Sequence, residues 1–334
     1  MRILLVRLSS FGDVLFTLPT ARALKEAHPG AELGWAIEAP LAGLVQGSRW
    51  VDAVFPATTR AWRKSPFSRG TWKEIRTLRE SLDAFAPDLV VDAQGLFKSA
   101  LVTWLAPSGR KVGFGYRAAT EAVNALVTDE HVTPPRDAVH SVDRALALAG
   151  HVAGPGPWSR VPDVSHAVDA PDETVDAFLE GLAGAPFALL QPFSSLAAKE
   201  WPPGNLLAAA RLLEENGLRP VLRFGPGERE RAEALVARGG GSLLLAPPAG
   251  AAATARLAAR ATLFVGADTG PTHLAAAAGT PTVALFGPTD PARFGPVGRR
   301  VAVLRAPPPY NPGSAPLAAL TADEIFEAAR PLLE

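Results

Sequence analysis

Short apolar runs alternate with longer amphipathic segments along the first half of the chain. Such runs are typical of strands buried in a parallel sheet, and the segments between them repeat their apolar positions at helical spacing. The expected strands are 3–6, 33–37, 51–55, 88–92 and 111–114. The expected helices are one that starts near Asp13 and runs to about Ala27, then 72–85, 96–105 and 139–149. This alternation predicts a parallel sheet with helices on both faces.

A Gly- and Pro-rich stretch at 151–165 interrupts the pattern and reads as a linker. A second alternating series follows it, with strands expected at 186–191, 220–224, 242–246, 262–266 and 281–286 and helices at 204–216, 229–237, 251–259 and 272–278. We therefore expect two doubly wound α/β domains, 1–160 and 161–320, facing each other across a cleft. A last helix at 321–334, N-capped by Thr321 with Glu324 in a capping box, could pack back on the first domain.

Composition narrows the classes of protein. The 33 basic and 33 acidic residues balance to a formal net charge of +0, which argues against a surface built for bulk nucleic-acid binding. The absence of cysteine excludes disulfides and thiolate metal sites. The N-terminal apolar run is too short for a signal peptide, and prolines divide the uncharged stretch 269–289, so we expect a cytoplasmic protein with no transmembrane helix.

Ligands of doubly wound sheets bind beyond the carboxyl ends of the strands, so we searched the loops that follow them. The loop after the first strand contains Ser10, Gly12 and Asp13. Glycine permits close approach of a ligand, and a carboxylate beside a cleft could act as a general base. The alternative is that Asp13 is only a first-turn acid that the helix dipole favours.

Two loops of the second half carry the strongest candidate chemistry. Ser194, Ser195 and Lys199 follow its first strand and could contact phosphate oxygens, although an exposed Ser-rich turn would look the same. The segment 268–273 (DTGPTH) places polar residues where a strand ends and a helix begins. A helix N-terminus with free N–H groups is a ready anion site, whereas His273 taken alone would be a structural histidine.

Three other patterns are set aside. Residues 113–118 fit a G-x-G-x-x-A fingerprint, but they lie late in the first half and lack an acid about 20 residues on, so an NAD site is not favoured. His131, Asp137 and His140 straddle a loop without a further ligand nearby, and the sequence contains no Asp-x-Asp pair. We therefore expect no metal site and no cofactor.

Positive charge gathers in one short stretch. Only Glu74 opposes its seven cations, which are Arg60, Arg63, Lys64, Arg69, Lys73, Arg76 and Arg79. A charge run is usually a solvated helix face, but here the cations and aromatic residues mix in a loop before the expected helix. This stretch fits an anionic substrate or an anionic membrane surface.

Several segments together resemble glycosyltransferase family 9, the bacterial lipopolysaccharide heptosyltransferases, and most closely its type I enzymes. They are 9–15 (SSFGDVL) with 17–19 (TLP), 62–64 (WRK), 92–100 (DAQGLFKSA), 194–202 (SSLAAKEWP) and 268–273 (DTGPTH). The resemblance spans nearly the whole chain. It implies a GT-B architecture, an N-terminal acceptor domain and a C-terminal nucleotide-sugar domain. The implied reaction moves L-glycero-D-manno-heptose from ADP-heptose, with inversion, to the first Kdo of Kdo₂–lipid A at the inner face of the cytoplasmic membrane.

The resemblance also implies roles for individual residues. Asp13 would be the general base, and Lys199 would stabilise the departing ADP. Donor contacts would come from Gly12, Ser194, Ser195, Lys199, Glu228, Asp268, Thr269, Gly270 and His273. Acceptor contacts would come from Ser10, Arg60, Arg63, Lys64, Gln94, Lys98 and Arg117. The alternatives are a family 9 enzyme that acts on a later core acceptor, a non-catalytic two-domain nucleotide or sugar binder, and an NAD-dependent oxidoreductase.

Overall fold

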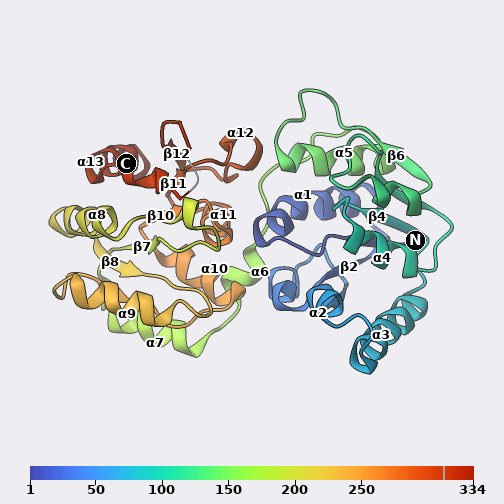
Figure 1. The fold of residues 1–334 in the computed structure, drawn as a ribbon, viewed down its shortest axis with the longest axis horizontal. Helices are drawn as coiled ribbons and strands as arrows, with labels where there is room; N and C mark the ends of the chain where they lie inside the picture. Colours follow the sequence, from blue (N-terminus) through green and yellow to red (C-terminus); the bar gives the residue numbers. More distant parts are fainter. Residues whose placement is uncertain (311–312) are drawn as a thin grey trace. The chain divides into compact units, whose positions relative to one another are not determined.

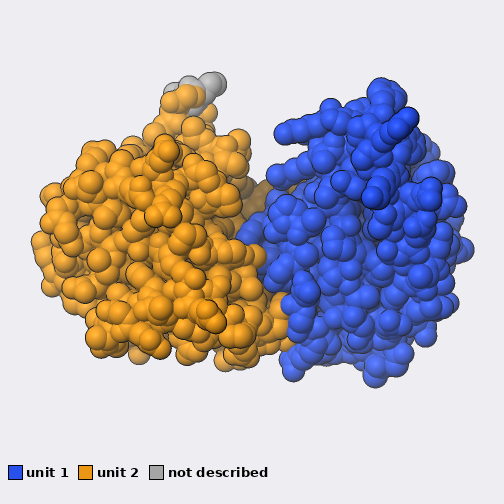
Figure 2. All heavy atoms as spheres, turned by 90° about the horizontal axis from the view of Figure 1, so that it is seen from below, with its two compact units in different colours: residues 1–162 blue, residues 163–334 orange. Residues whose placement is uncertain are grey.

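The computed structural model describes residues 1–310 and 313–334. The chain folds into two compact units, Met1–Pro162 and Asp163–Glu334, which are coloured separately in Figure 2. The division falls inside the Gly- and Pro-rich stretch that the sequence marks as a linker. Each unit is built around its own sheet, which lets the two be described one at a time.

The first unit holds a six-stranded parallel sheet in the order β3-β2-β1-β4-β5-β6 (Figure 1). Its strands are β1 (Arg2–Val6), β2 (Glu32–Glu38), β3 (Ala53–Ala57), β4 (Leu89–Asp92), β5 (Lys111–Phe114) and β6 (Glu130–Val132). Its helices are α1 (Phe11–Ala27), α2 (Thr59–Lys64), α3 (Arg69–Phe85), α4 (Phe97–Leu105) and α5 (Ser141–Ala153), with short 3₁₀ turns at Ala39–Leu44 and Ala122–Val127.

The second unit repeats this plan with the order β12-β11-β10-β7-β8-β9, again all parallel. Its strands are β7 (Phe187–Gln191), β8 (Arg219–Leu222), β9 (Leu244–Leu245), β10 (Leu263–Ala267), β11 (Thr282–Phe286) and β12 (Val301–Arg305). Its helices are α6 (Ser165–Asp169), α7 (Glu173–Gly181), α8 (Pro203–Glu215), α9 (Arg229–Arg238), α10 (Ala251–Arg260), α11 (Gly270–Ala277), α12 (Pro291–Phe294) and α13 (Ala322–Leu333). Counted from its own first strand, each sheet follows the doubly wound order 3-2-1-4-5-6.

Burial explains why the apolar runs become central strands. All residues of β4, β7, β10 and β11 are buried, because helices cover both faces of the sheet. Helix α1 is buried along most of its length and packs on α5, so a conventional polar face is nearly absent from it. The continuous apolar runs of the sequence therefore correspond to the centre of each sheet.

The structure adds elements that the pattern of the sequence does not reveal. Helices α2, α6, α7 and α12 and strands β6 and β12 were not expected, and the expected strand 242–246 shrinks to the two residues of β9. Strands β6 and β12 lie at sheet edges and keep exposed positions, so they lack the continuous apolar signal of a central strand. The expected linker also begins later, because α5 runs to Ala153.

The last helix belongs to the second unit. Helix α13 packs against α8, β11 and β12 of that unit. Its start follows the expected capping box, in which Thr321 Oγ1 accepts from the Glu324 N–H at 3.2 Å and Glu324 Oε2 accepts from the Thr321 N–H at 2.8 Å. Within the described residues, no helix combines the length and the apolar character that crossing a membrane requires.

Candidate active site

Each sheet has one point at which the chain reverses its winding direction, between β1 and β4 in the first unit and between β7 and β10 in the second. Doubly wound proteins bind ligands at the carboxyl edge of this switch point. Val6 pairs with Asp92 there in the first sheet, and Gly266 pairs with Gln191 in the second. The segments that follow these four strands contain Asp13, Gln94, Lys199 and Asp268, and Asp13 is the third residue of α1. We call residues 7–13, which lead from β1 into α1, the Asp13 loop.

The Asp13 carboxylate is held by groups from its own loop. Its Oδ2 accepts from the backbone N–H and the hydroxyl of Ser10, each at 3.0 Å, which completes a capping box at the start of α1. Its Oδ1 pairs with Arg7 Nη2 at 2.9 Å, and the carboxylate remains 27% exposed. Asp13 thus completes the capping box of which Ser10 is the N-cap, as expected for a first-turn acid, while part of its carboxylate faces solvent. Its role as a general base stays a prediction.

Gln94 fixes the backbone of that loop from the neighbouring strand end. Its Oε1 accepts from the Leu8 N–H at 2.8 Å, and its Nε2 donates to the Ser9 carbonyl at 3.2 Å. The side chain is only 5% exposed. Both ends of its amide are therefore bonded to the segment that leads to Asp13, and its expected contact with an acceptor stays a prediction.

A buried carboxylate supports Gln94 in turn. Asp92 is fully buried and accepts four hydrogen bonds, from the Gln94 N–H (2.9 Å), the Gly95 N–H (3.0 Å), Thr103 Oγ1 (2.9 Å) and Asn124 Nδ2 (2.7 Å). Gly95 has a φ of +69°, which a residue with a side chain rarely adopts. This network fixes the turn after β4 and hence the direction of the Gln94 side chain.

Under the role of general base that the resemblance implies for Asp13, replacing Gln94 with leucine should lower kcat by about 10- to 100-fold, because small displacements of a general base are costly. The KM for a donor held by the second unit should change little. Gln94→Glu keeps an acceptor for the Leu8 N–H and should retain more activity than Gln94→Leu. Steady-state kinetics tests this, with Gln46→Leu, at an exposed position, as the control. An unchanged kcat in Gln94→Leu would show that the loop before Asp13 keeps its conformation without the hydrogen bonds of Gln94.

Cations surround the same edge. Lys98 donates to the Ser9 hydroxyl. Burial lowers the pKa of its ammonium, and the positive charges of Arg60 and Arg7 lower it further, whereas the negative charges of Glu38 and Asp13 act in the opposite direction. Arg60 is exposed at the start of α2, and Arg63 and Lys64 are exposed in its last turn. Arg117 is exposed in the turn after β5. The structure thus brings Lys98 and Arg60 to the Asp13 loop, whereas contacts of Arg63, Lys64 and Arg117 with a ligand stay predictions.

In the second unit, a triad of the half-buried Lys199 and the buried Asp268 and His273 joins the two switch-point loops. Lys199 Nζ pairs with Asp268 Oδ2 at 2.6 Å, and His273 Nε2 lies 3.3 Å from Asp268 Oδ1. Burial raises the pKa of the Asp268 carboxyl, but its hydrogen bonds to His273 and Lys199 and their charges outweigh burial and bring it to about 2. Asp268 therefore stays ionised at neutral pH and fixes the ammonium of Lys199 at the edge of the sheet.

Backbone groups complete this half of the site. Helix α11 begins at Gly270 with Thr269 as its N-cap, so the Gly270 N–H lies at the same edge as Lys199. Pro271 has no N–H, and the N–H groups of Thr272 and His273 donate to the Thr269 carbonyl at 3.1 and 3.4 Å. Ser195 is exposed, and Ser194 is half-buried with its Oγ accepting from the Leu196 N–H at 3.3 Å. The arrangement offers hydroxyls, a backbone N–H and an ammonium to an anion.

Glu228 and a buried arginine lie at the end of the neighbouring strand. Glu228 Oε2 accepts from the Gly225 N–H at 2.5 Å, which ties the acid to the loop after β8; its role toward a ribose stays a prediction. Arg223 is 6% exposed and donates to Gln191 Oε1 at 2.7 Å and to Thr254 Oγ1 at 3.1 Å. Burial lowers the pKa of its guanidinium to about 10, against the charge of Glu228.

Neither Arg7 nor Arg223 was expected from the sequence. Both directly follow a central strand, Arg7 after β1 and Arg223 after β8, so the rule that led to Asp13 applies to them too. The described residues contain no group of three or more His, Asp or Glu that could hold a metal ion. Residues 113–118 run from β5 into a turn, without the α-helix that a dinucleotide fingerprint requires.

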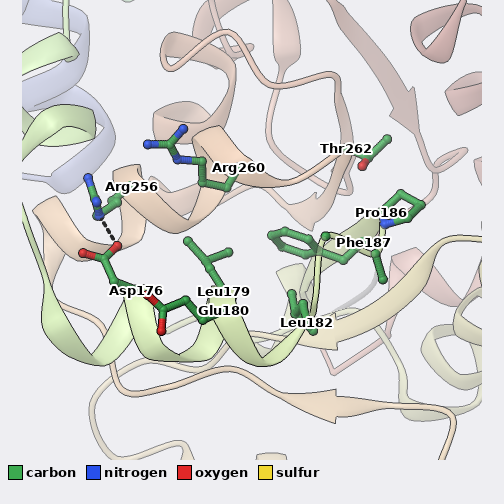
Figure 3. Close-up of a pocket in the computed structure, with 11 residues that line it drawn as sticks. Asp176, Leu179, Glu180, Leu182, Pro186, Phe187, Arg256, Arg260 and Thr262 are labelled. Atoms are coloured by element: carbon green, nitrogen blue, oxygen red, sulfur yellow. Dashed lines mark hydrogen bonds and ion pairs between the residues drawn. The ribbon is translucent and has the colours of Figure 1, made fainter.

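A cavity of about 710 Å³ in the second unit lies away from these loops. It is lined by α7, α10 and the starts of β7 and β10, including Phe187 and Thr262 (Figure 3). Its most buried charge, Arg256, is already paired with Asp176 at 2.6 Å. Because it opens at the amino ends of the strands, it is not part of the switch-point site.

Comparison with known proteins identifies the architecture. A model of glycosyltransferase family 9 (heptosyltransferase) matches residues 75–313. The chain is 34% identical over 313 residues to lipopolysaccharide heptosyltransferase 1 of Escherichia coli strain K12. The aligned region covers 92% of this chain and 94% of that protein.

Solved structures agree. The E. coli heptosyltransferase WaaC with ADP gives a TM-score of 0.85 at 32% identity, over 99% of this chain and 100% of that one. WaaC with ADP-2-deoxy-2-fluoro heptose gives 0.82 at 33% identity, over 99% of each chain. The resemblance inferred from the sequence motifs is confirmed, as is the expected fold of two parallel-sheet α/β domains. The chain belongs to glycosyltransferase family 9, the heptosyltransferases.

Proposed function

We propose that this protein transfers L-glycero-D-manno-heptose from ADP-heptose to the first Kdo sugar of Kdo₂–lipid A, with inversion at the anomeric carbon. The observation that carries the proposal is the Lys199–Asp268–His273 triad beside the N-terminus of α11, at the switch point of the second sheet. Support comes from 34% identity to an E. coli protein named lipopolysaccharide heptosyltransferase 1 and from the likeness to WaaC with an ADP-heptose analogue.

The second unit would hold the donor. The hydroxyls of Ser194 and Ser195, the Gly270 N–H at the start of α11 and the ammonium of Lys199 suit the oxygens of a diphosphate. As the bond between the anomeric carbon and the diphosphate oxygen breaks, negative charge grows on the departing ADP. A preorganised ammonium at that position stabilises the transition state more than the ground state.

The first unit would activate the acceptor. Asp13 would take the proton of the attacking Kdo hydroxyl. The oxygen of that hydroxyl would form the new bond to the anomeric carbon, on the face opposite the departing ADP. Arg7 and Ser10 hold the carboxylate in one orientation. Lys98 and Arg60 place positive charge near the Asp13 loop, where the carboxylate of an acidic sugar would be attracted.

Two further features follow from this proposal. The protein's own cations would supply the charge stabilisation at the diphosphate, so transfer should not depend on a divalent metal. Because the acceptor is anchored in a bilayer, the enzyme would work in the cytoplasm as a peripheral protein on the inner face of the membrane.

The test is a transfer assay with purified full-length protein, ADP-heptose and two acceptors, Kdo₂–lipid A and its already heptosylated product. We expect transfer to Kdo₂–lipid A, persisting in EDTA, and at least about tenfold less with the heptosylated acceptor. The product should carry the opposite anomeric configuration to that of the donor. Preference for the heptosylated acceptor would instead place the enzyme later in core assembly, and a requirement for added Mg²⁺ would contradict the role given to the protein's cations.

A further inference from the structure

Two large aromatic side chains are exposed to solvent near the junction of α2 and α3. Phe67, in the turn that joins the helices, is 92% exposed, and Trp72, in the first turn of α3, is 61% exposed. All residues from 63 to 70 are exposed. We call residues 63–73 the α2–α3 tip. Exposed aromatic residues that lie close together mark surfaces that bind another apolar phase more often than isolated ones do.

The tip is an ordered structure. Ser68 caps α3 by accepting from the Thr71 N–H at 3.0 Å, and Thr71 Oγ1 donates to the Ser65 carbonyl at 2.8 Å. Trp62 Nε1 donates to Glu74 Oε2 at 2.9 Å, which joins α2 to α3, and the two helices lie together at one side of the first unit (Figure 1). Phe67 is therefore held outward by a hydrogen-bonded turn.

Unpaired positive charge surrounds the two aromatic residues. Within the described part of the chain, no acidic group pairs with any of the four cations of the tip, which are Arg63, Lys64, Arg69 and Lys73. The nearest acid in sequence, Glu74, accepts from Thr58 and Trp62, and these hydrogen bonds lower the pKa of its carboxyl. Farther along α3, Arg76 and Arg79 pair with Glu80 and Asp83, so the unpaired cations of this helix are the two in its first turns, Arg69 and Lys73.

The combination of protruding aromatic residues and unpaired cations is what an anionic bilayer surface attracts. Aromatic rings settle at the level of the lipid headgroups, and each nearby Lys or Arg gains from the negative surface potential. An acidic protein surface could also attract the cations, but the proposed acceptor is a lipid-linked sugar. The tip belongs to the same unit as Asp13, and Arg60, three residues before it, lies near Lys98.

We propose that the α2–α3 tip docks the enzyme on anionic phospholipid, with Phe67 and Trp72 entering the headgroup layer and the four cations facing lipid phosphates. This inference rests on the proposed function for the identity of the bilayer-bound substrate. It revises the expectation for Arg63 and Lys64, which would face lipid phosphates and not the acceptor sugar. Arg60 of the same run and Lys98 on α4 would still serve the sugar near Asp13.

Co-sedimentation of the full-length protein with vesicles tests the docking directly. The parent should bind vesicles of phosphatidylcholine with phosphatidylglycerol, weakly or not at all vesicles of phosphatidylcholine alone, and should be released by salt. Phe67→Ala/Trp72→Ala should bind the anionic vesicles about tenfold more weakly or worse. Arg69→Gln/Lys73→Gln should lose most of the preference for phosphatidylglycerol. The matched control is Trp104→Ala, since Trp104 is 62% exposed on α4 of the same unit and should not matter.

A second readout separates this inference from the proposed function. With acceptor embedded in anionic vesicles, Phe67→Ala/Trp72→Ala should transfer heptose about tenfold more slowly than the parent; with a deacylated acceptor in solution, the two should be equal. If the parent transfers heptose to neither acceptor, the proposed function fails, while the vesicle-binding experiment still tests whether the α2–α3 tip binds the membrane. Parent-like vesicle binding by the aromatic variant, an equal loss in Trp104→Ala, or no vesicle binding by the parent would each overturn the docking role. The last result would leave an acidic protein as the partner of the tip.

Discussion

Replacing Asp13 with asparagine should lower kcat for heptose transfer by about 10²- to 10⁴-fold, the range that general bases contribute. Asparagine has the same shape, and its oxygen can still accept from the N–H of Ser10, the N-cap residue of α1. It cannot take a proton from the acceptor hydroxyl, and it leaves Arg7 without its charged partner at 2.9 Å. The KM for ADP-heptose should be nearly unchanged, because every expected donor contact except Gly12 belongs to the other unit.

Steady-state rates with circular dichroism as a check on folding measure this effect. The matched control is Asp172→Asn, because Asp172 caps α7 by accepting from the Val175 N–H at 3.0 Å and serves no chemistry here. Its kcat should equal that of the parent. If Asp13→Asn keeps more than a tenth of the parental kcat, Asp13 is only a helix cap and the base must be another group.

Replacing Lys199 with methionine should lower kcat by about 10²- to 10³-fold, the usual cost of removing one group that stabilises transition-state charge. Methionine keeps the length of the side chain but removes the ammonium that lies 2.6 Å from Asp268. Lys199→Arg should recover part of the rate, since a guanidinium can also meet phosphate oxygens. Single-turnover kinetics isolates the transfer step from the release of ADP.

The lysine variant will also be less stable, by about 2 kcal/mol, because the nearly buried Asp268 carboxylate loses its cation. A second ion pair helps to separate stability from chemistry: Lys25 lies 2.7 Å from Asp52, and its side chain is 15% exposed, against 20% for Lys199. The Asp52 carboxylate is 38% exposed, against 5% for Asp268, so the loss of stability should be smaller than in the Lys199 variant. Lys25→Met should lower the midpoint of urea unfolding while leaving kcat unchanged. Equal losses of kcat in the two methionine variants would assign the effect of Lys199 to stability alone.

The central strands could be predicted because burial on both faces demands unbroken apolar runs. The expected strands 111–114 and 281–286 differ from β5 and β11 by at most one residue at either end. Apart from α7, which has nine residues, the missed elements are short or lie at an edge. The six residues of α2 and the three of β6 are too few for a periodic pattern to develop, and tertiary contacts decide their conformation.

The loops of the candidate site could be predicted from the strand ends, but the side-chain pairs within them could not. Spacing placed Asp13 and Lys199 beyond strands, yet nothing local to the sequence says that Arg7 reaches Asp13 or that Lys199 reaches a carboxylate 69 residues away. Gln94 shows the limit most clearly. Its position after β4 suggests a ligand contact, whereas its amide is bonded to the backbone of Leu8 and Ser9.

The common strand order of the two sheets makes the chain a pair of equivalent scaffolds. In each, the chemistry is carried by two loops, and neither loop takes part in the ladders that join the strands. Under the proposed function, the choice of donor and the choice of acceptor are therefore encoded in separate stretches of sequence, joined by residues 154–164. Specificity for the donor sugar or for the acceptor sugar could then change, through natural or engineered substitutions, without substitutions in the unit that recognises the second sugar.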